Sequence, residues 1–293
     1  MTAGASGFLG SKLRAQLTAG GHQVVQLVRR TPTSADQVQW WPDQGIVDVD
    51  TLRAADAVIN LSGAGVQDKR WSDEYKKLLR TSRVAPSRTL ARAIAELPDG
   101  DRPDLLNGSA VGFYGDRGDE VLTEESPPGE GFLCDVAIAW EAATAAAEDA
   151  GARVVRLRTG LPLHRDGGLL KGLLLPFRLG IGGKLAGGRM WMPIISMTDW
   201  LRAVTFLLER KDIRGPVNVS GPEPVRNAEL TNVLGRVLHR PTIAPVPGFA
   251  IRALFGEVAQ DLLASGRQRP RVLLDNGFTF VHPDVEAAVR AGL

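Results

Sequence analysis

The stretch MTAGASGFLGSKL, residues 1–13, decides the fold. Its glycines Gly4, Gly7 and Gly10 follow one another at intervals of three residues, just before a segment with helical spacing of apolar residues. Glycines in this pattern allow a tight turn, bring backbone N–H groups against a pyrophosphate, and let a helix pack closely on a strand. A helix that begins near Phe8 would point its positive end at those phosphates. The stretch therefore predicts a dinucleotide-binding loop, although glycine-rich turns also occur for purely structural reasons.

The segments around the loop favour dinucleotide binding. The helical segment 11–20 ends at a pair of glycines, which is a plausible C-cap, and 22–30 then has the apolar, β-branched character of a strand. Only residues 1–3 precede Gly4, so the strand expected before the loop is either a stub or begins upstream of Met1. The order strand, glycine loop, helix, strand is the context in which the glycine motif binds a cofactor.

The second strand ends in Arg29 and Arg30. An acidic residue at this position would bind the ribose 2′-OH of NAD, whereas arginine suits the 2′-phosphate of NADP. Two solvated arginines at a strand end are the alternative interpretation. Because the position is the one that distinguishes the two cofactors, we expect NADP rather than NAD.

The first 160 residues alternate between strand-like and helix-like segments. Strands are expected at 56–63, 103–115 and 152–160, and helices at 72–97 and 134–151. In the longer helix, Ser72 is an N-cap candidate and Pro86 is expected to kink or divide the helix. Strands separated by such helices imply right-handed crossovers and a mostly parallel sheet. We therefore predict an α/β, Rossmann-like, doubly wound fold.

The character of the sequence changes after residue 160. The stretch 161–193 is rich in glycine and apolar residues with little periodicity, and helices are expected again at 198–211 and 227–241. We expect a smaller C-terminal substrate lobe rather than two domains joined by a linker. The expected division is a dinucleotide-binding domain of residues 1–162, to which 194–222 returns, and a lobe made of 163–193 and 223–293.

Composition limits the classes of function. The 35 basic and 33 acidic residues nearly cancel, so the net charge of +2 gives no reason to expect binding to nucleic acid or an anionic membrane. The single cysteine, Cys134, excludes an internal disulfide, and the N-terminus lacks a signal-peptide pattern, so a cytoplasmic location is expected. Lys171, Pro176 and Arg178 interrupt the longest apolar run, 167–183, which is a poor membrane span. The four histidines have no metal-ligand spacing, and no G-x-S-x-G elbow occurs.

Several motifs carry a family resemblance over nearly the whole chain. They are GASGFLG (4–10), NLSG (60–63), DKRW (68–71), SAVGFYGDRG (109–118), LLPFRLGIGG (174–183), GPVNVSGPEPVRNAE (215–229) and FGE…GFTF (255–280). In these motifs the sequence resembles the extended short-chain dehydrogenase/reductase superfamily. Within it, the chain resembles the NAD(P)-dependent epimerase-family subgroup with a C-terminal DUF1731 segment, here 242–293.

The resemblance implies a Rossmann-like domain that holds NADP, with the later chain forming a small lobe over the nicotinamide. It assigns the glycine loop to the pyrophosphate, Arg29 and Arg30 to the 2′-phosphate, and Pro162 to the nicotinamide side. It also places the turn at Leu61, Ser62 and Gly63 along the adenosine. Arg83, on the long helix, is expected to contact the cofactor. The cofactor residues expected in this way are Gly4, Ser6, Gly7, Phe8, Leu9, Gly10, Arg29, Arg30, Leu61, Ser62, Gly63, Arg83 and Pro162.

The Tyr-x-x-x-Lys pair by which the superfamily usually transfers protons is missing. The chain has only two tyrosines, and the residues four positions after them are Leu79 and Gly118. If Glu141 aligns with the glutamate that commonly follows the pair, Leu133 and Ala137 occupy the tyrosine and lysine positions, and neither side chain can move a proton.

Two hydroxyls remain as candidate catalytic groups, Ser109 and Tyr114. Without a lysine beside it, the phenol should keep a pKa near 10, which makes it a poor base at neutral pH. The lone Cys134 on an apolar helix is more typical of packing than of catalysis. Two functions stay open: an NADP-dependent oxidoreductase or epimerase acting on an unidentified small molecule, and an inactive NADP(H)-binding sensor or partner-binding protein. No metal is expected, and the oligomeric state is not indicated.

Overall fold

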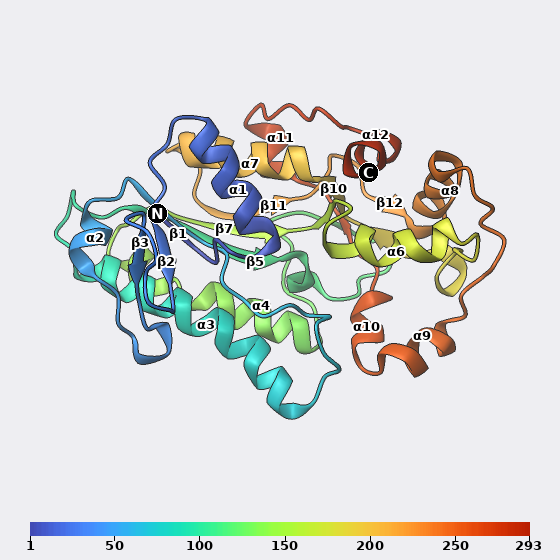
Figure 1. Cartoon of the computed structure of the whole chain (residues 1–293), viewed down its shortest axis with the longest axis horizontal. Helices are drawn as coiled ribbons and strands as arrows, with labels where there is room; N and C mark the ends of the chain where they lie inside the picture. The colour runs from blue at the N-terminus through green and yellow to red at the C-terminus, as the bar shows by residue number, and fades with distance from the viewer.

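The computed structural model describes residues 1–293, with the exception of the Phe255 side chain. A seven-stranded sheet lies at the centre of its N-terminal domain (Figure 1), and all neighbouring strands in this sheet are parallel. This confirms the predicted α/β, Rossmann-like fold. From one edge to the other the strands are β11 (Gly215–Val219), β7 (Val154–Thr159), β5 (Asp104–Ala110), β4 (Ala57–Asn60), β1 (Thr2–Ala3), β2 (Gln26–Val28) and β3 (Gln37–Gln39).

Helices cover both faces of this sheet (Figure 1). One face carries α1 (Phe8–Ala19) and α7 (Met197–Glu209), which pack against each other. The other face carries α3 (Asp73–Glu96), which contacts α2, α4 and α5. The bounds of these three helices are Val49–Arg53, Phe132–Ala142 and Ala145–Asp149. Each face has its own cluster of buried apolar side chains, so the sheet is buried on both sides as a parallel sheet requires.

Two helices, α3 and the one expected over 134–151, differ in part from the prediction. Helix α3 begins where expected, because the Ser72 side chain accepts a hydrogen bond from the Tyr75 backbone N–H at 3.2 Å. Pro86 lies inside α3 but does not divide it. Next to the proline, the Ser87 hydroxyl donates to the Arg83 carbonyl at 2.9 Å. The helix expected over 134–151 is instead two helices, α4 and α5, separated by residues 143–144.

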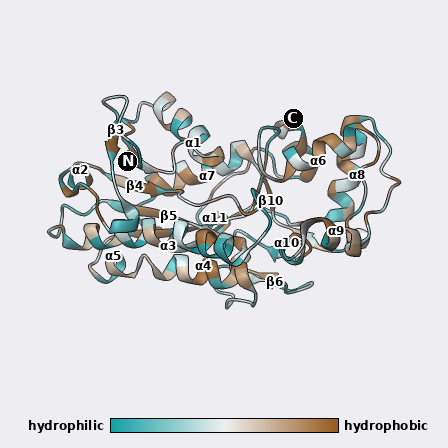
Figure 2. Ribbon diagram, turned by 60° about the horizontal axis from the view of Figure 1, so that its bottom comes forward, coloured by the Kyte–Doolittle hydropathy of each residue, from teal (hydrophilic) through white to brown (hydrophobic). Residues whose placement is uncertain are grey.

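The C-terminal lobe packs around a third apolar cluster, which is centred on Leu174, Phe177 and Leu234. Figure 2 shows hydrophobic residues along α6, α8 and α9 of this lobe. Its helices are α6 (Gly168–Arg178), α8 (Asn227–Leu238), α9 (Gly248–Phe255), α10 (Val258–Leu262) and α12 (Val285–Gly292). Helix α6 was not predicted, because its glycines, Pro176 and dense apolar residues hide the helical period.

Short strands and turns connect the lobe to the sheet. The 3₁₀ turns are η2 (Val111–Tyr114) and η3 (Ala186–Gly188), and a third, η1 (Pro42–Gln44), lies between β3 and α2 in the N-terminal domain. The short strands are β6 (Val121–Leu122), β8 (Leu161–Leu163), β9 (Trp191–Met192), β10 (Ile194–Ser196), β12 (Val225–Arg226) and β13 (Arg267–Gln268). They form three two-stranded pairs, β10 with β8, β12 with β9 and β13 with β6. No helix among the described residues is both long and apolar enough to cross a membrane.

One part of the tail packs outside the lobe. Helix α11 (Arg271–Asp275) contacts β11. Leu273 and Phe278 join the apolar cluster between the sheet and α7. The expected lobe of 223–293 therefore includes a segment, residues 271–280, whose apolar side chains are buried against the N-terminal domain.

Candidate cofactor site

The strand order reverses between β1 and β4. The chain runs from β1 outward to β3 and then returns to β4 on the other side of β1, where Ala3 and Asn60 are register partners. In open α/β sheets, ligands bind in the crevice at the carboxyl ends of the strands at such a point. The loops that begin at Gly4 and Leu61 both start at this edge, so the fold brings together the two segments that the sequence assigned to a cofactor.

The glycine loop requires glycine at two positions. Gly4 has a φ of 76°, and a Cβ there would lie 2.6 Å from the Leu61 carbonyl carbon. A Cβ on Gly10 would overlap the Gly4 carbonyl, so α1 can approach β1 closely only with glycine at this position. Helix α1 has Gly7 as its N-cap residue and no acidic side chain in its first turn. The loop thus presents the positive end of a helix to the crevice, where an anion would be stabilised.

The other residues of the loop have different environments. Ser6 is exposed, whereas Phe8 and Leu9 are half-buried and pack against the apolar cluster beneath α1. The Gly7 N–H donates to the Gly4 carbonyl at 3.0 Å and closes the turn. The loop is therefore held by its own backbone, and its side chains are not needed to shape it.

Arg29 and Arg30 directly follow β2, the neighbour of β1, and both are exposed. Because β1 and β2 are parallel, the two arginines lie at the same edge of the sheet as the glycine loop. Arg30 donates to the Thr31 carbonyl at 3.0 Å and to the Thr33 hydroxyl at 3.2 Å. Two guanidinium groups at this edge supply the charge that a ribose 2′-phosphate would need.

Arg83 supports the loop after β4. Its guanidinium donates to the carbonyls of Leu79 and Ala64, each at 2.9 Å, and lies against Gly63. Burial lowers the pKa of Arg83 to about 10. A side chain at Gly63 would press on this guanidinium, with its Cβ 3.1 Å from the Arg83 Cζ. The arginine expected to contact the cofactor is thus hydrogen-bonded to the loop at the Ala64 carbonyl and packed against Gly63.

A buried polar network lies below the same loop. The Asn60 side chain donates to Ser87 Oγ at 2.9 Å and to Asn107 Oδ1 at 2.8 Å, and Trp140 Nε1 donates to Ser87 Oγ at 3.0 Å. The Asn60 carbonyl oxygen of the side chain accepts the Ser62 N–H at 3.1 Å. Sequence reasoning missed this network, because its members come from β4, α3, β5 and α4. It fixes the backbone of Ser62 at the carboxyl edge.

On the opposite side of the crevice, the chain after β8 closes over the first turn of α1. The Phe8 ring is packed so tightly on Gly167 that a Cβ there would overlap it. Lys12 Nζ lies 3.2 Å from His164 Nε2 and 3.2 Å from Asp166 Oδ2. Burial, followed by the positive charge of Lys12, lowers the pKa of His164. This group of ionisable side chains was also not predicted.

Pro162, expected near the nicotinamide, is the middle residue of β8. It is half-buried and is the register partner of Ile195 in β10. The turn before it is fixed where the Gly160 N–H donates to the Val219 carbonyl at 3.0 Å. Pro162 is therefore placed by strand pairing just beyond the ends of β7 and β11.

Ser109 takes part in a buried ion-pair cluster. Its hydroxyl donates to Glu141 Oε1 at 2.6 Å. Arg158 donates to both Glu141 oxygens, from Nε at 2.8 Å and from a terminal nitrogen at 2.9 Å. All three side chains are buried. The bidentate geometry offsets the desolvation of both charges and fixes α4 on the ends of β5 and β7.

Tyr114 belongs to the same cluster. Its side chain is fully buried, its hydroxyl donates to Asn218 Oδ1 at 2.7 Å, and it accepts from Arg158 at 2.8 Å. Burial raises the pKa of Tyr114 to about 12, in spite of the nearby guanidinium. Burial also raises the pKa of Glu124, which accepts the Asn218 N–H at 3.0 Å. A phenol in this environment holds its proton and connects β11 to the cluster.

Helix α4 carries Leu133 and Ala137, the two residues that an alignment on Glu141 expects at the positions of the catalytic pair. Leu133 is half-buried beside Gly112, and Ala137 is buried. The Cys134 thiol is hydrogen-bonded to the carbonyls of Phe113 and Gly129 at 3.0 and 3.1 Å, and burial raises its pKa. The thiol is therefore neutral and engaged in packing. Among the described residues, no group of three acidic, histidine or cysteine side chains is placed to hold a metal ion.

The switch-point loop and the two arginines lie at the place in a Rossmann-type sheet where dinucleotides bind. A family model described as "NAD dependent epimerase/dehydratase family" matches residues 1–220, and one described as "Domain of unknown function (DUF1731)" matches residues 246–291. The chain belongs to the NAD dependent epimerase/dehydratase family, which confirms the resemblance read from the motifs.

The chain is similar to relatives along its whole length. It is 42% identical to the epimerase family protein Mb2239 of Mycobacterium bovis, over 98% of this chain and 95% of that protein. The crystal structure of the human epimerase family protein SDR39U1 (isoform2) with NADPH is 30% identical, covers 99% of this chain and 97% of its own, and has a TM-score of 0.88. A nucleoside-diphosphate sugar epimerase from Corynebacterium glutamicum is 37% identical with a TM-score of 0.82, covering 100% of this chain and 57% of its own.

Proposed function

We propose that this chain binds NADP(H) at the carboxyl edge of its sheet. The observation that carries the proposal is the contact of Gly4 with Leu61 and of Gly10 with Gly4, since it holds the first turn of α1 open to a pyrophosphate. Arg29 and Arg30 add positive charge at the same edge, which supports the phosphorylated cofactor over NAD. The similarity to a human protein crystallised with NADPH also supports it.

The proposed contacts follow the order of the sheet. The pyrophosphate lies on the glycine loop and the start of α1, the 2′-phosphate by the two arginines, the adenosine along the loop after β4, and the nicotinamide toward β8. Arg83 acts indirectly, by fixing the backbone of that loop. The proposed cofactor residues are Gly4, Ser6, Gly7, Phe8, Leu9, Gly10, Arg29, Arg30, Leu61, Ser62, Gly63 and Pro162.

Thermal unfolding of the purified chain tests this proposal. A ligand that binds only the folded state raises the melting temperature with its concentration. We expect NADPH to raise it and NADH at the same concentration to raise it less. No shift from either nucleotide would contradict the proposal, and an equal shift from both would contradict the role of the arginines.

Membership of the family supports a further step, an oxidoreductase or epimerase reaction on a small molecule. Bound NADP(H) would supply the hydride chemistry. The protein must then handle one proton, and Ser109 is the hydroxyl at the end of β5 that we assign to it. We assign Tyr114 a positioning role, because its buried phenol is bonded to Arg158 and Asn218.

A specific observation favours a second candidate, an NADP(H)-binding protein without turnover. Leu133 and Ala137 cannot transfer a proton, and the Ser109 hydroxyl already donates to a buried carboxylate. Two assays separate the candidates: NADPH with a panel of carbonyl compounds, followed by NADPH oxidation, and NADP⁺ with a panel of nucleotide sugars, followed by analysis of the sugar product. Turnover that falls more than about tenfold in Ser109→Ala supports the catalytic role. An unchanged rate would show that Ser109 is not the proton-transfer group. If cofactor binds but neither NADPH oxidation nor a changed sugar is found with any compound, the binding protein without turnover is supported.

A further inference from the structure

The most exposed apolar side chains of the molecule are all in the C-terminal lobe. Leu175, Leu179, Ile181, Ile243, Phe249 and Leu254 are each 61–84% exposed, whereas the other exposed large apolar residues among those described are 38–55% exposed. We call these six residues the apolar end. Scattered exposed leucines are ordinary, but six such side chains gathered in two segments indicate an interaction surface.

The two segments that form the apolar end lie side by side. The Val246 N–H donates to the Lys184 carbonyl at 3.0 Å, and the Ala186 N–H donates to the Val246 carbonyl at 2.9 Å. Arg240 Nε donates to the Arg178 carbonyl at 2.9 Å. Residues 178–186 thus run alongside 240–246, which brings Leu179 and Ile181 next to Ile243. Figure 1 shows that α6, α8 and α9 together make the end of the molecule farthest from β3.

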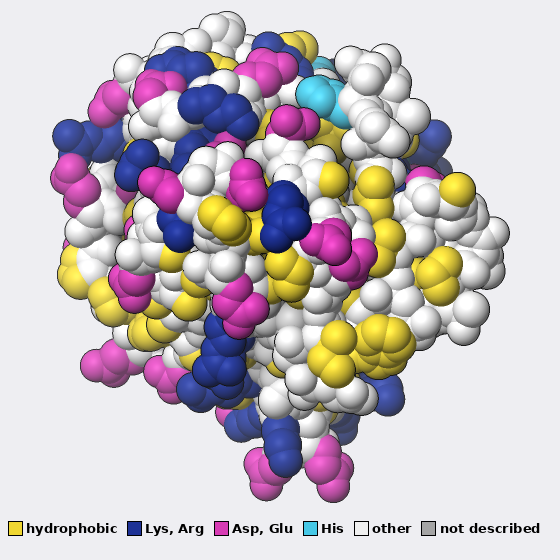
Figure 3. All heavy atoms as spheres, turned by 90° about the vertical axis from the view of Figure 1, so that its left-hand side faces the viewer, with side chains coloured by type: hydrophobic (Ala, Val, Ile, Leu, Met, Phe, Trp, Pro, Cys, Tyr) yellow, Lys and Arg dark blue, Asp and Glu magenta, His cyan; other side chains and the backbone are white. Residues whose placement is uncertain are grey.

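Within the two segments that carry the apolar end, all charges have a single sign, and the acidic side chains next to these segments include Glu257 after α9 and Glu286 beside Arg236. Residues 167–198 and 230–256 contain no aspartate or glutamate, although the whole chain has 33. Exposed basic side chains flank the apolar ones, namely Lys171, Arg178, Lys184, Arg240 and Arg252. The opposite end of the molecule differs, since basic and acidic side chains alternate over its surface (Figure 3). The near-neutral net charge of the chain therefore hides a strongly uneven distribution.

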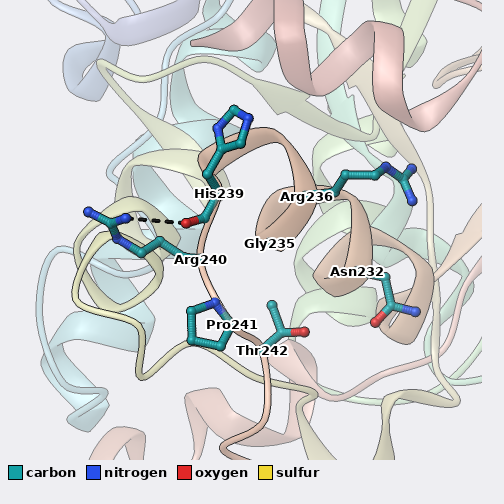
Figure 4. Close-up of a pocket in the computed structure, with 7 residues that line it drawn as sticks. All are labelled: Asn232, Gly235, Arg236, His239, Arg240, Pro241 and Thr242. Carbon is teal, nitrogen blue, oxygen red and sulfur yellow. Dashed lines mark hydrogen bonds between the residues drawn. The ribbon is translucent and has the colours of Figure 1, made fainter.

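A basic hollow lies in the same lobe at the end of α8. It has a volume of about 460 Å³ and is lined by Asn232, Gly235, Arg236, His239, Arg240, Pro241 and Thr242. In Figure 4, His239 and Arg240 lie together on one side of the hollow, where Arg240 donates to the His239 carbonyl at 3.2 Å. Arg236 is paired with Glu286 at 2.6 Å, so Arg240 is the arginine of this lining left to attract an anion.

We propose that the apolar end docks on the surface of an anionic lipid bilayer. Exposed apolar side chains can enter the boundary between headgroups and acyl chains, and the flanking lysines and arginines attract lipid phosphates. A second copy of this chain fits less well, because self-association would bring two sets of like charges together. The structure has no spanning helix among its described residues, so the contact is with the surface of the membrane.

Vesicle sedimentation tests the proposal. One set of vesicles contains equal parts phosphatidylglycerol and phosphatidylcholine, and the other contains phosphatidylcholine alone. We expect the chain to sediment with the anionic vesicles at low salt, to be released by high salt, and to stay in solution with the neutral vesicles.

Paired variants locate the surface. Leu179→Ser with Ile243→Ser should weaken anionic-vesicle binding at least about tenfold. The matched control, Leu78→Ser with Val281→Ser, removes two exposed apolar side chains elsewhere and should bind as the parent does. Lys171→Gln with Lys184→Gln should also weaken binding, whereas Lys69→Gln with Lys77→Gln should not.

Three results would overturn the proposal. The first is equal loss of binding in the patch and control variants, and the second is equal binding to both kinds of vesicle. The third is no vesicle binding by the parent chain. In that case light scattering assigns the surface. If the parent chain is a dimer and Leu179→Ser with Ile243→Ser converts it to a monomer, the apolar end binds a second copy. If the parent chain is a monomer, an acidic protein is the remaining partner. Unchanged melting temperatures show that the variants fold.

Discussion

The β1–α1 loop and helix α4 both lie near the carboxyl ends of the strands of one sheet. The loop has the features that cofactor binding needs, whereas α4 lacks the side chains that proton transfer needs. The loop acts through its backbone, where Gly4 and Gly10 allow contacts that a side chain would prevent. Helix α4 should act through side chains, and it presents Leu133 and Ala137 instead. Its one buried carboxylate, Glu141, is held by Arg158. The comparison teaches that a cofactor loop and a proton-transfer group are independent parts of such a site, so one does not imply the other.

The largest effect is expected from the ion pair under α4. Arg158→Met leaves Glu141 as an uncompensated buried charge, which should lower the free energy of unfolding by about 3–5 kcal/mol. Chemical denaturation measures it. Arg53→Met breaks ion pairs with Asp50 and Asp101 that are largely exposed, and should cost less than about 1 kcal/mol. If the two variants lose the same stability, the Arg158 cluster is not the structural element described here.

A smaller effect on stability, together with a large one on binding, is expected at the loop. Gly10→Ala places a Cβ against the Gly4 carbonyl and should cost about 1–3 kcal/mol of stability. It should also weaken NADPH binding more than about tenfold, because α1 is pushed away from β1. Gly172→Ala on α6 meets nothing within 4 Å and serves as the control. If Gly10→Ala leaves the NADPH affinity unchanged, the claim that the close packing of α1 on β1 forms the cofactor site is contradicted.

Arg29 sharpens the comparison by cofactor type. Arg29→Ala removes a charge-assisted contact to the 2′-phosphate and should weaken NADPH binding by about 1.5–3 kcal/mol. NADH binding should not change, since NADH lacks that phosphate. Arg214→Ala removes an exposed arginine just before β11, the outer strand on the far side of the sheet from β2. It should alter neither NADPH binding nor NADH binding. Equal losses for both cofactors would show that Arg29 has another role.

The smallest effect concerns His164. Burial and Lys12 lower its pKa in the folded state, so the unfolded chain binds a proton more readily. The stabilisation is present above the unfolded pKa of about 6.5 and is lost as the pH falls toward the folded value. His164→Gln should remove this part of the pH dependence, measured as the denaturation midpoint at about pH 7.5 and about pH 5.5. If His164→Gln shows the same difference between the two midpoints as the parent chain, the role of His164 in the pH dependence is contradicted.

The sequence predicted the parts of the fold that depend on local pattern. The glycine spacing, the Ser72 cap and the alternation of strands and helices were enough for the Rossmann-like sheet, and the ordered motifs were enough for the family. Pro86 was expected to break α3, but the helix continues through it, packed on the sheet. Helix α6 was missed because its dense apolar residues are buried against the lobe on one side and exposed on another, which hides the period of 3.6.

The chemistry of the site was harder to predict, because it depends on contacts between distant segments. The sequence pointed to the hydroxyls of Ser109 and Tyr114. It did not predict their hydrogen bonds to Glu141 and Arg158, because these partners come from separate elements. The three arginines of the apolar strand 152–160, Arg153, Arg156 and Arg158, are a local signal that buried partners exist. The uneven charge of the C-terminal lobe could have been read from the sequence, but only with the two segments known to be adjacent.

Fluorescence titration of the purified chain with NADPH and, separately, with NADH tests the central claim most directly. The glycine loop and the two arginines predict saturable binding of NADPH at micromolar concentrations and a clear preference over NADH. Binding of neither nucleotide would contradict the claim, and would mean that the loop conserves only the packing of α1 on β1.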